Sequence, residues 1–493
     1  MVASLSVVAM AAFFRATAAG VKRRYDEMFR PQIHFSPAKN WMNDPNGLIW
    51  FEGEYHLFFQ HNPYGNQWGH MSWGHAVSRD LLHWTELPVA IPEDARDMIF
   101  SGSVVADAGN SAGFGRPGET ALVAVYTGHA QDGSRQAQEI AYSLDRGRSW
   151  TKYAGNPVLD LGMKEFRDPK VFWFEPAGKW VMAVAKPAER KVAFFQSADL
   201  KVWNPGGTFG PAGAVEGVWE CPDLFPLPVE NRQGETKWVL KVDSSPINPG
   251  SGCGGQVFIG SFDGTNFVAD SLEPQPLDIG EDYYASTSWS NLPGTRHLTI
   301  GWMDNPRYAG ETPTTPWRSA MSLPRALSLR TTAGGIRLLQ RPVRELQALQ
   351  TNRQHHGSVK SGQVLVTATE KSGAHRICLT AEPEGRSSFV VVIGSGAADC
   401  VRIECDGPGG RLLLSRSGPA AIRSFVSHHA GPLETGGTVV LDLYIDRSSV
   451  EVFANDGALT VSELMFPESG SYSVKLEGEG LQADVWDLKS IWS

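Results

Sequence analysis

Cysteine, basic charge and long apolar segments are all scarce in this sequence. Five cysteines among 493 residues, at spacings that match no zinc pattern, exclude a disulfide framework and a zinc module. Cys400 and Cys405 are close enough in sequence to pair, but buried free thiols are the simpler expectation. The formal charge of -9 argues against a nucleic-acid or anionic-membrane partner, because both require a basic surface.

The apolar run at residues 5–14 is too short to span a membrane, and no later segment is long enough. Residues 16–18 (ATA) follow it and have the small-residue pattern of a signal-peptidase site. However, no Lys or Arg precedes the run, and Arg15 interrupts the approach to that site. Residues 1–28 are therefore expected to be either a signal peptide of a secreted or periplasmic protein, or a disordered extension of a cytoplasmic one.

Helical periodicity is also rare, and strand-like segments dominate. Apolar and aromatic runs of four to seven residues end at Gly, Pro, Asn or Asp, for example at 55–60, 121–126, 179–184 and 237–242. Such runs are typical of strands, so we expect an all-β fold.

A short pattern repeats through the first half of the chain. Ser-x-Asp is followed by an aromatic residue six or seven positions after the Ser, and the aromatic positions step by 66, 53 and 64 residues. The Asp side chain is suited to capping a tight hairpin turn. Units of this length with about four strands predict β-propeller blades, and a less regular unit near 285–330 would make five. The alternative is chance repetition of a common hairpin. The repeats are Ser78/Asp80/Trp84, Ser143/Asp145/Trp150, Ser197/Asp199/Trp203 and Ser261/Asp263/Phe267.

The composition changes after about residue 335. At 493 residues the chain exceeds one ordinary core, so two domains are expected. Trp-rich segments become rare, and new strand-like runs separated by Gly and Ser turns begin near residue 360. We therefore predict a five-bladed β-propeller at 29–335, a linker at 336–355 and a β-sandwich domain at 356–493.

Three acidic residues stand in short segments that end at proline. They are Asp44 in 43–45 (NDP), which lies within 41–47 (WMNDPNG), Asp168 in 167–169 (RDP) and Glu220 in 220–222 (ECP). Only a fold can bring them together, because they lie far apart in the chain. Carboxylates that converge in one pocket without a paired cation are typical of glycoside hydrolysis.

These segments resemble glycoside hydrolase family 32, which contains the invertases, exo-inulinases and levanases. The motifs are residues 41–47, 100–103 (FSGS), 166–170 (FRDPK) and 219–225 (WECPDLF), in the order the family has them. The late segments 301–303 (GWM) and 316–325 (PWRSAMSLPR) are similar as well. The resemblance extends from about residue 30 to the end, and it implies a five-bladed propeller followed by a β-sandwich.

By this resemblance Asp44 is the nucleophile. Pro45 restricts the backbone beside it, and Asn43 is placed to donate a hydrogen bond that would keep the pKa of the carboxylate low. The alternative is an Asx turn that opens a hairpin.

The resemblance makes Glu220 the general acid and base. It stands in a strand-like segment whose neighbours, Trp219 and Cys221, should point away from it. Apolar surroundings would raise its pKa, as an acid requires. The alternative is an exposed glutamate on a strand.

Asp168 is expected to bind sugar hydroxyls and stabilise the transition state, since three close carboxylates cannot all ionise cheaply. Arg167 is expected to contact the sugar or a neighbouring carboxylate, or to form an ordinary structural ion pair. The other expected substrate-binding residues are Trp41, Asn43, Gln60, Trp68, Phe100, Ser101 and Trp302, with core packing as the alternative for Trp302. The histidines are scattered, so we expect no metal site and no cofactor.

The resemblance implies a retaining exo-β-fructosidase that releases terminal fructose from levan or inulin, and from sucrose as well. Many fructan-degrading members have an aromatic residue two positions after Asp304, where this chain has Pro306. The alternatives are a sucrose-specific invertase, a fructosyltransferase and a non-catalytic carbohydrate-binding propeller. The oligomeric state is left open.

Overall fold

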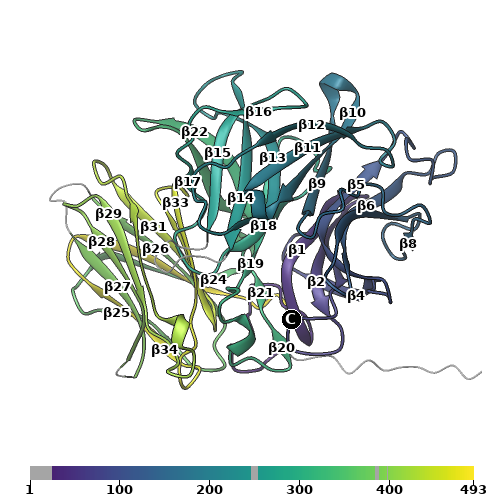
Figure 1. Cartoon of the computed structure of the whole chain (residues 1–493). Helices are drawn as coiled ribbons and strands as arrows, with labels where there is room; N and C mark the ends of the chain where they lie inside the picture. The colour runs from purple at the N-terminus through teal and green to yellow at the C-terminus, as the bar shows by residue number, and fades with distance from the viewer. Residues whose placement is uncertain (1–24, 246–253, 383–387, 397, 493) are drawn as a thin grey trace, which may run out of the picture.

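The computed structural model describes residues 25–245, 254–382, 388–396 and 398–492, and these residues form an almost entirely β structure (Figure 1). The all-β prediction is confirmed. Short 3-10 helices interrupt the strands at η1 (Glu175–Ala177), η2 (Pro187–Glu189), η3 (Ala309–Glu311), η4 (Arg344–Leu349) and η5 (Arg423–Phe425). No helix among the described residues is long and apolar enough to cross a membrane.

Five sheets occupy residues 40–342, which we call the five-sheet region. The first contains β1 (Asn40–Phe51), β2 (Glu54–Asn62), β3 (Ser72–Ser78) and β4 (Trp84–Ile91), with β20 (Trp317–Arg318) parallel to β1. The second contains β5 (Asp97–Asp107), β6 (Ala121–Ala130), β7 (Gln136–Ser143) and β8 (Thr151–Lys152), and the third contains β9 (Arg167–Phe174), β10 (Lys179–Lys186), β11 (Lys191–Ser197) and β12 (Asn204–Phe209). The fourth contains β13 (Val218–Pro228), β14 (Thr236–Ser245), β15 (Gly255–Phe262), β16 (Phe267–Ala269) and β17 (Gln275–Pro276). The fifth contains β18 (Tyr284–Ser288), β19 (Leu298–Met303), β21 (Ala320–Met321), β22 (Arg325–Thr332) and β23 (Gly335–Pro342).

The first strands of these sheets contact one another in a closed cycle. β1 contacts β5, β5 contacts β9, β9 contacts β13, β13 contacts β18, and β18 returns to β1. Residues far apart in sequence therefore meet where the five strands meet.

Each of these five inner strands has a β-bulge at which two residues oppose one on the neighbouring strand. The bulged pairs are Asn43/Asp44, Phe100/Ser101, Asp168/Pro169, Cys221/Pro222 and Ala285/Ser286. A bulge bends the strand and redirects side chains. Three of the five pairs contain a residue singled out in the sequence, and Glu220 directly precedes a fourth, so the candidate site lies on and beside the bulges.

The repeated Ser-x-Asp segments are the turns between the third and fourth strands of the first four sheets, as expected for hairpins. In the first, Asp80 Oδ1 accepts hydrogen bonds from the backbone N–H groups of Leu82 and His83. The returning Trp84 donates its Nε1–H to the carbonyl of Leu81. The same kind of turn therefore recurs at the same place in four sheets, so the repeat is not a chance pattern.

The remainder of the chain forms a second unit, which we call the two-sheet region. One sheet contains β24 (Gln350–Val359), β35 (Leu481–Leu488), β26 (Ala374–Ala381), β31 (Val439–Ile445), β32 (Ser449–Ala454) and β33 (Leu459–Leu464). The other contains β25 (Val364–Ala368), β34 (Tyr472–Glu477), β27 (Phe389–Ser395), β28 (Ala398–Asp406), β29 (Arg411–Arg416) and β30 (Ser427–Pro432). Apolar residues from both sheets, such as Ile377 and Val391, form one buried core. Figure 1 shows this region in green and yellow beside the five sheets.

Buried ion pairs join the two regions. Arg325 on β22 donates to Glu451 on β32 at 2.7 Å, and both side chains are fully buried. Arg416 on β29 pairs with Asp282, two residues before the inner strand β18 begins. Because a buried charge without its partner is costly, these pairs fix how the regions meet.

Two predicted boundaries are wrong. The linker predicted at 336–355 is mostly strand, because β23 pairs with β22 in the fifth sheet and β24 pairs with β35 in the two-sheet region. Only residues 343–349 lie between them. Residues 25–28 also belong to the fold, since the ring of Tyr25 stacks on Trp492 with centroids 4.1 Å apart. Residues 1–24 lie outside the described residues.

Candidate active site

A pocket of about 440 Å³ opens where the bulges of the inner strands meet. It brings together all eleven residues singled out from the sequence, although β1, β2, β5, β9, β13 and β19 and the turn after β2 contribute them. They are Trp41, Asn43, Asp44, Gln60, Trp68, Phe100, Ser101, Arg167, Asp168, Glu220 and Trp302. The convergence of distant acids is therefore present in the structure.

Asp44 is held by two neutral donors. Asn43 Nδ2 donates to its Oδ1 at 2.9 Å, and Ser101 Oγ donates to its Oδ2 at 2.6 Å. The hydrogen bond from Asn43 was expected, but the expectation that it keeps the pKa of Asp44 low is wrong. Burial raises the pKa of Asp44 and outweighs both hydrogen bonds, and the negative charge of Glu220 adds to the rise. The hydroxyl of Ser101 was expected to contact the sugar, but in the structure it donates its hydrogen to Asp44.

Glu220 has polar surroundings rather than the apolar ones we expected. Arg167 donates to Glu220 Oε1 through Nε at 3.1 Å and Nη2 at 2.8 Å. The hydroxyl of Tyr284 donates to Oε2 at 2.6 Å. Arg167 also bonds Glu165 at 2.6 Å through Nη1, so it links two carboxylates. The expectation of acids without a paired cation is therefore wrong for Glu220.

Asp168 lines the same pocket as the other two acids. Burial, together with the negative charges of Glu220 and Asp44, raises its pKa to about 7 against the opposing effect of Arg167. Its backbone has φ of 65°, a left-handed conformation that is uncommon outside glycine and is sustained here by the bulge. The backbone N–H of Cys221 donates to Asp168 Oδ2 at 2.9 Å.

Cys221 does not point away from the pocket as an extended strand would require. The bulge and a φ of 49° turn it inward, and its Sγ lies 3.6 Å from both Asp44 Oδ2 and Asp168 Oδ2. Burial raises the pKa of this thiol well above its ordinary value, so it stays protonated beside the two carboxylates. Cys221, Cys378 and Cys405 are thiols rather than halves of disulfides, which excludes the Cys400–Cys405 pair.

Aromatic side chains form the walls of the pocket. Trp41 and Trp302 lie with ring centroids 6.3 Å apart, and Trp41 Nε1 donates to Asn43 Oδ1 at 2.7 Å. Trp302 is almost fully buried, so it both packs in the core and lines the pocket. Trp68 is 54% exposed and Phe100 is partly buried, and the two rings meet edge to face. These rings offer apolar faces for the C–H side of a sugar.

Seven further residues line the pocket and were not assigned to it from the sequence. They are His129, Gln136, Glu165, Cys221, Ser245, Tyr284 and Pro306. Tyr284 begins the fifth inner strand, directly before the bulge of that strand. Pro306 occupies the position where an aromatic residue was expected. Among the described residues, no group of three or more His, Cys, Asp or Glu is arranged to hold a metal ion.

The family comparison agrees with this geometry. The family model described as "Glycosyl hydrolases family 32 N-terminal domain" matches residues 34–342, and "Glycosyl hydrolases family 32 C terminal" matches residues 345–493. The chain belongs to glycosyl hydrolases family 32. The two matches divide the chain between β23 and η4, where the sheets also divide it.

Individual relatives resemble the chain over nearly its whole length. It is 42% identical to a levanase from Bacillus subtilis, covering 95% of this chain and 72% of that protein. It is 38% identical to an extracellular exo-inulinase from Aspergillus awamori, covering 95% and 96%. The crystal structure of exo-inulinase from that species superposes with a TM-score of 0.88 at 37% identity, covering 95% of this chain and all of the other. A β-fructofuranosidase from Schwanniomyces occidentalis, complexed with fructosyl-erythritol, superposes with a TM-score of 0.83 at 32% identity, covering 94% and 98%.

Proposed function

We propose that this protein is a retaining exo-β-fructosidase that releases terminal fructose from levan or inulin and also hydrolyses sucrose. The observation that carries the proposal is the meeting of Asp44, Asp168 and Glu220 in one aromatic-walled pocket of a family 32 chain. The levanase and exo-inulinase relatives support fructan as the substrate class.

In the first step, Asp44 attacks the anomeric carbon of the terminal fructosyl unit. The bond from that carbon to the leaving oxygen breaks, and Glu220 gives its proton to that oxygen. Asp44 is suited to attack because Asn43 and Ser101 orient both of its oxygens. Tyr284 and Arg167 orient the carboxyl group of Glu220 in the same way.

In the second step, Glu220 takes a proton from water, the water oxygen attacks the same carbon, and the Asp44 carboxylate departs. Two displacements at one carbon give retention. Asp168 accepts hydrogen bonds from sugar hydroxyls, and these strengthen as positive charge develops on the ring. The mechanism requires the carboxyl groups of Asp44 and Glu220 to lie about 5–5.5 Å apart.

Exo action is favoured by the local sequence. The chain has Asp rather than Glu in residues 43–45 (NDP), and endo-acting relatives by resemblance have Glu there. Trp41 and Met42 before it resemble levanases and exo-inulinases. A pocket at the meeting point of five strand ends also suits a chain end better than the middle of a polymer.

We propose that the five-sheet region is a five-bladed β-propeller and that the two-sheet region is a β-sandwich. The closed cycle of contacts among β1, β5, β9, β13 and β18 supports the propeller. The shared core of two six-stranded sheets supports the sandwich.

We also propose that the protein is secreted. The apolar run at residues 5–14 supports secretion, and so does the extracellular exo-inulinase relative.

A transferase or a sucrose-specific invertase would use the same acids. A non-catalytic binding protein would have no use for a nucleophile paired with an acid.

The test is a time course of products from levan, inulin and sucrose, separated by chromatography. Fructose as the sole early product from a polymer supports exo hydrolysis. Short oligosaccharides appearing first would contradict exo action, and turnover of sucrose alone would make the enzyme an invertase. Larger saccharides formed from sucrose would indicate transfer.

A further inference from the structure

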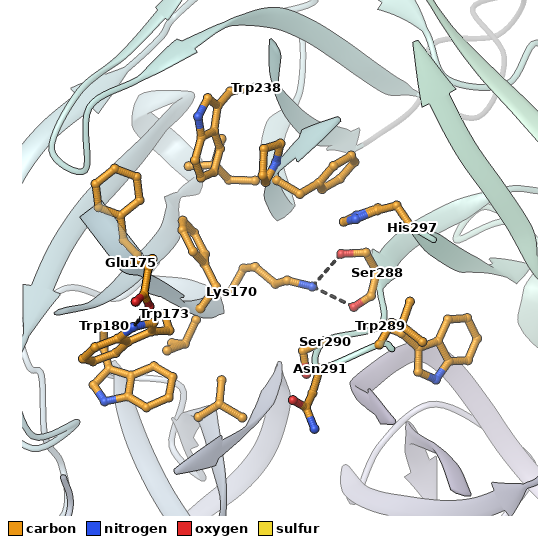
Figure 2. A pocket seen from close by; sticks show the side chains of 18 of the residues that line it. Lys170, Trp173, Glu175, Trp180, Trp238, Ser288, Trp289, Ser290, Asn291 and His297 are labelled. Carbon is orange, nitrogen blue, oxygen red and sulfur yellow. Dashed lines mark hydrogen bonds between the residues drawn. The ribbon is translucent and has the colours of Figure 1, made fainter. Parts of the chain in front are cut away.

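A second pocket, of about 700 Å³, lies at the other end of the inner strands (Figure 2). We call it the axial pocket. It is lined by the later residues of the strands that supply the active site, among them Ala106 on β5, Trp173 on β9, Phe225 on β13 and Ser288 on β18. Asp168 and Trp173 are five residues apart on β9, about 15 Å along an extended strand. The two pockets are therefore separate sites on opposite ends of the same strands.

The wall of the axial pocket carries exposed aromatic surface. Trp173 is 43% exposed, although its ring also packs edge to face on Trp180 with centroids 5.1 Å apart. Trp173 Nε1 donates to Glu175 Oε2 at 2.6 Å, which fixes the indole and places a carboxylate at its edge. Trp238 lies across the pocket (Figure 2). Trp238 is partly buried, whereas the fixed and exposed indole of Trp173 beside a carboxylate is suited to the mixed C–H and O–H surface of a sugar.

The cations that line this pocket are already neutralised. Lys170 Nζ donates to the carbonyl of Ser288 at 2.8 Å and to its Oγ at 2.9 Å, and pairs with Asp223 at 3.2 Å. Arg296 Nη1 pairs with Glu345 at 2.6 Å. A phosphate or carboxylate ligand would have to break one of these pairs. The pocket therefore suits a neutral ligand.

One buried polar atom in the axial pocket lacks a partner within the part of the chain that the structure describes. The ring of His297 stacks on Phe225 with centroids 4.0 Å apart, and its Nε2 is buried without a hydrogen bond. In Figure 2 the imidazole of His297 faces the cavity. Burial lowers the pKa of His297 to about 4, so the ring is neutral. A sugar hydroxyl satisfies a neutral imidazole in either tautomer, because it both donates and accepts.

We infer that the axial pocket is a second binding site for a neutral carbohydrate, namely a segment of the polymeric fructan. The choice of fructan rests on the proposed function, whereas the neutral-sugar chemistry rests on the pocket itself. The segment stacks on Trp173 and Trp238 and hydrogen-bonds to His297 and Glu175. It holds the polymer on the enzyme and takes no part in bond cleavage.

The site is not a continuation of the catalytic pocket. Between the two lies a void of only about 20 Å³, lined by Asp168 and Cys221 on one side and Lys170 on the other. That volume admits about one water and no sugar. A fructan chain bound in the axial pocket therefore does not pass through this void to reach Asp44.

Binding is tested first, in protein made inactive by Asp44→Asn. Calorimetry is carried out with oligosaccharides of inulin and levan, and with sucrose as a short probe. An oligosaccharide should bind at two sites, the catalytic pocket and the axial pocket. Adding Trp173→Ala and Trp238→Ala should leave one site, and Trp173→Phe should keep both. Leu272→Ala, at an exposed residue that lines neither pocket, is the matched control.

Kinetics give the second measurement. In otherwise wild-type enzyme, Trp173→Ala should raise KM for the polymer about fivefold, as expected for loss of one aromatic face, and leave sucrose hydrolysis unchanged. Equal losses on sucrose and polymer with a lowered melting temperature would overturn the inference, and so would one site in the Asp44→Asn protein. A loss of self-association in the Trp173→Ala protein, without a change in sugar binding, would assign the pocket to a second copy of the chain instead. If wild-type enzyme releases no fructose while two sugar sites remain, the proposed function fails and the second site stands.

Discussion

The guanidinium of Arg167 donates two hydrogen bonds to a single oxygen of Glu220, Oε1, from Nε at 3.1 Å and from Nη2 at 2.8 Å. The other oxygen of Glu220 is held by Tyr284 at 2.6 Å. Both oxygens are therefore oriented before substrate arrives, and the strand β9 that carries Arg167 also carries Asp168. One strand thus positions an acid on its neighbour and presents another acid itself.

Arg167→Met should lower kcat on sucrose about 10–100-fold. The change removes charge-assisted hydrogen bonds from Glu220, each of which contributes about 1.5–3 kcal/mol. Steady-state kinetics measure the loss. Arg148→Lys, at an exposed arginine that pairs with Glu54 outside the pocket, is the control and should behave as wild type. Unchanged kcat in Arg167→Met would show that the ion pair is only structural.

Tyr284→Phe should lower kcat about tenfold with little change in the melting temperature. The substitution removes only the hydroxyl that donates to Glu220 Oε2, and the ring stays in the buried cluster with Trp41 and Trp302. Loss of one hydrogen bond to a charged group in the transition state corresponds to about 1.5 kcal/mol. An equal rise in KM at constant kcat would instead assign Tyr284 to substrate binding.

Ser101→Ala should move the acidic limb of the pH profile of kcat/KM to higher pH by about one unit. Ser101 donates to the ionised form of Asp44 and so lowers its pKa against the effect of burial. Without that donor the pKa of Asp44 rises further, and the nucleophile is ionised only at higher pH. Rates measured across the acidic range test this. A limb that stays in place while kcat falls would assign the hydroxyl to sugar binding.

Stability should fall as the solution becomes alkaline because of His34. Burial alone lowers the pKa of His34, but its hydrogen bonds to Asp446 at 2.8 Å and Glu451 at 3.0 Å outweigh burial and raise the pKa to about 9. The folded pKa lies above the unfolded one, so the stabilisation is complete below about pH 6.5 and is lost as pH rises through about 9. The difference between the folded and unfolded pKa values of His34 corresponds to about 3 kcal/mol of folding stability.

Melting temperatures measured from about pH 6 to pH 10 test the role of His34. The wild-type curve should decline over the upper part of this range, and His34→Gln should melt lower at pH 6 and decline less. His355→Gln is the control, since the His355 side chain is 56% exposed and pairs with Asp484 at the surface. Parallel curves for wild type and His34→Gln would contradict the assignment.

Much of this fold was accessible from the sequence because local signals repeat. The Ser-x-Asp turns predicted four hairpins, and each lies where the third strand turns into the fourth. The linker was misplaced because residues 340–346 (QRPVREL) are largely polar and include a proline, yet residues 340–342 end strand β23, which is stabilised by pairing with β22. Tertiary pairing of that kind leaves no local signature.

The sequence predicted eleven residues of the candidate site, but it did not predict the contacts that they make with one another. The acids and the aromatic walls stand in recognisable segments, and all eleven residues line one pocket. The inward turn of Cys221 depends on a β-bulge, which period-two alternation cannot reveal. The pairing of Glu220 with Tyr284 joins residues 64 positions apart, so only the closed cycle of inner strands brings them together.

The central claim is that Asp44 forms a bond to fructose while Glu220 moves the proton. It is tested most directly in a Glu220→Gln variant supplied with a β-fructofuranosyl donor whose leaving group needs no protonation. The variant should form the covalent intermediate and fail to hydrolyse it, because the base that activates water is absent. Mass spectrometry of the digested protein should find one fructosyl unit on the peptide that contains Asp44. An adduct on Asp168, or turnover of the donor with an inverted product and no adduct, would contradict the account.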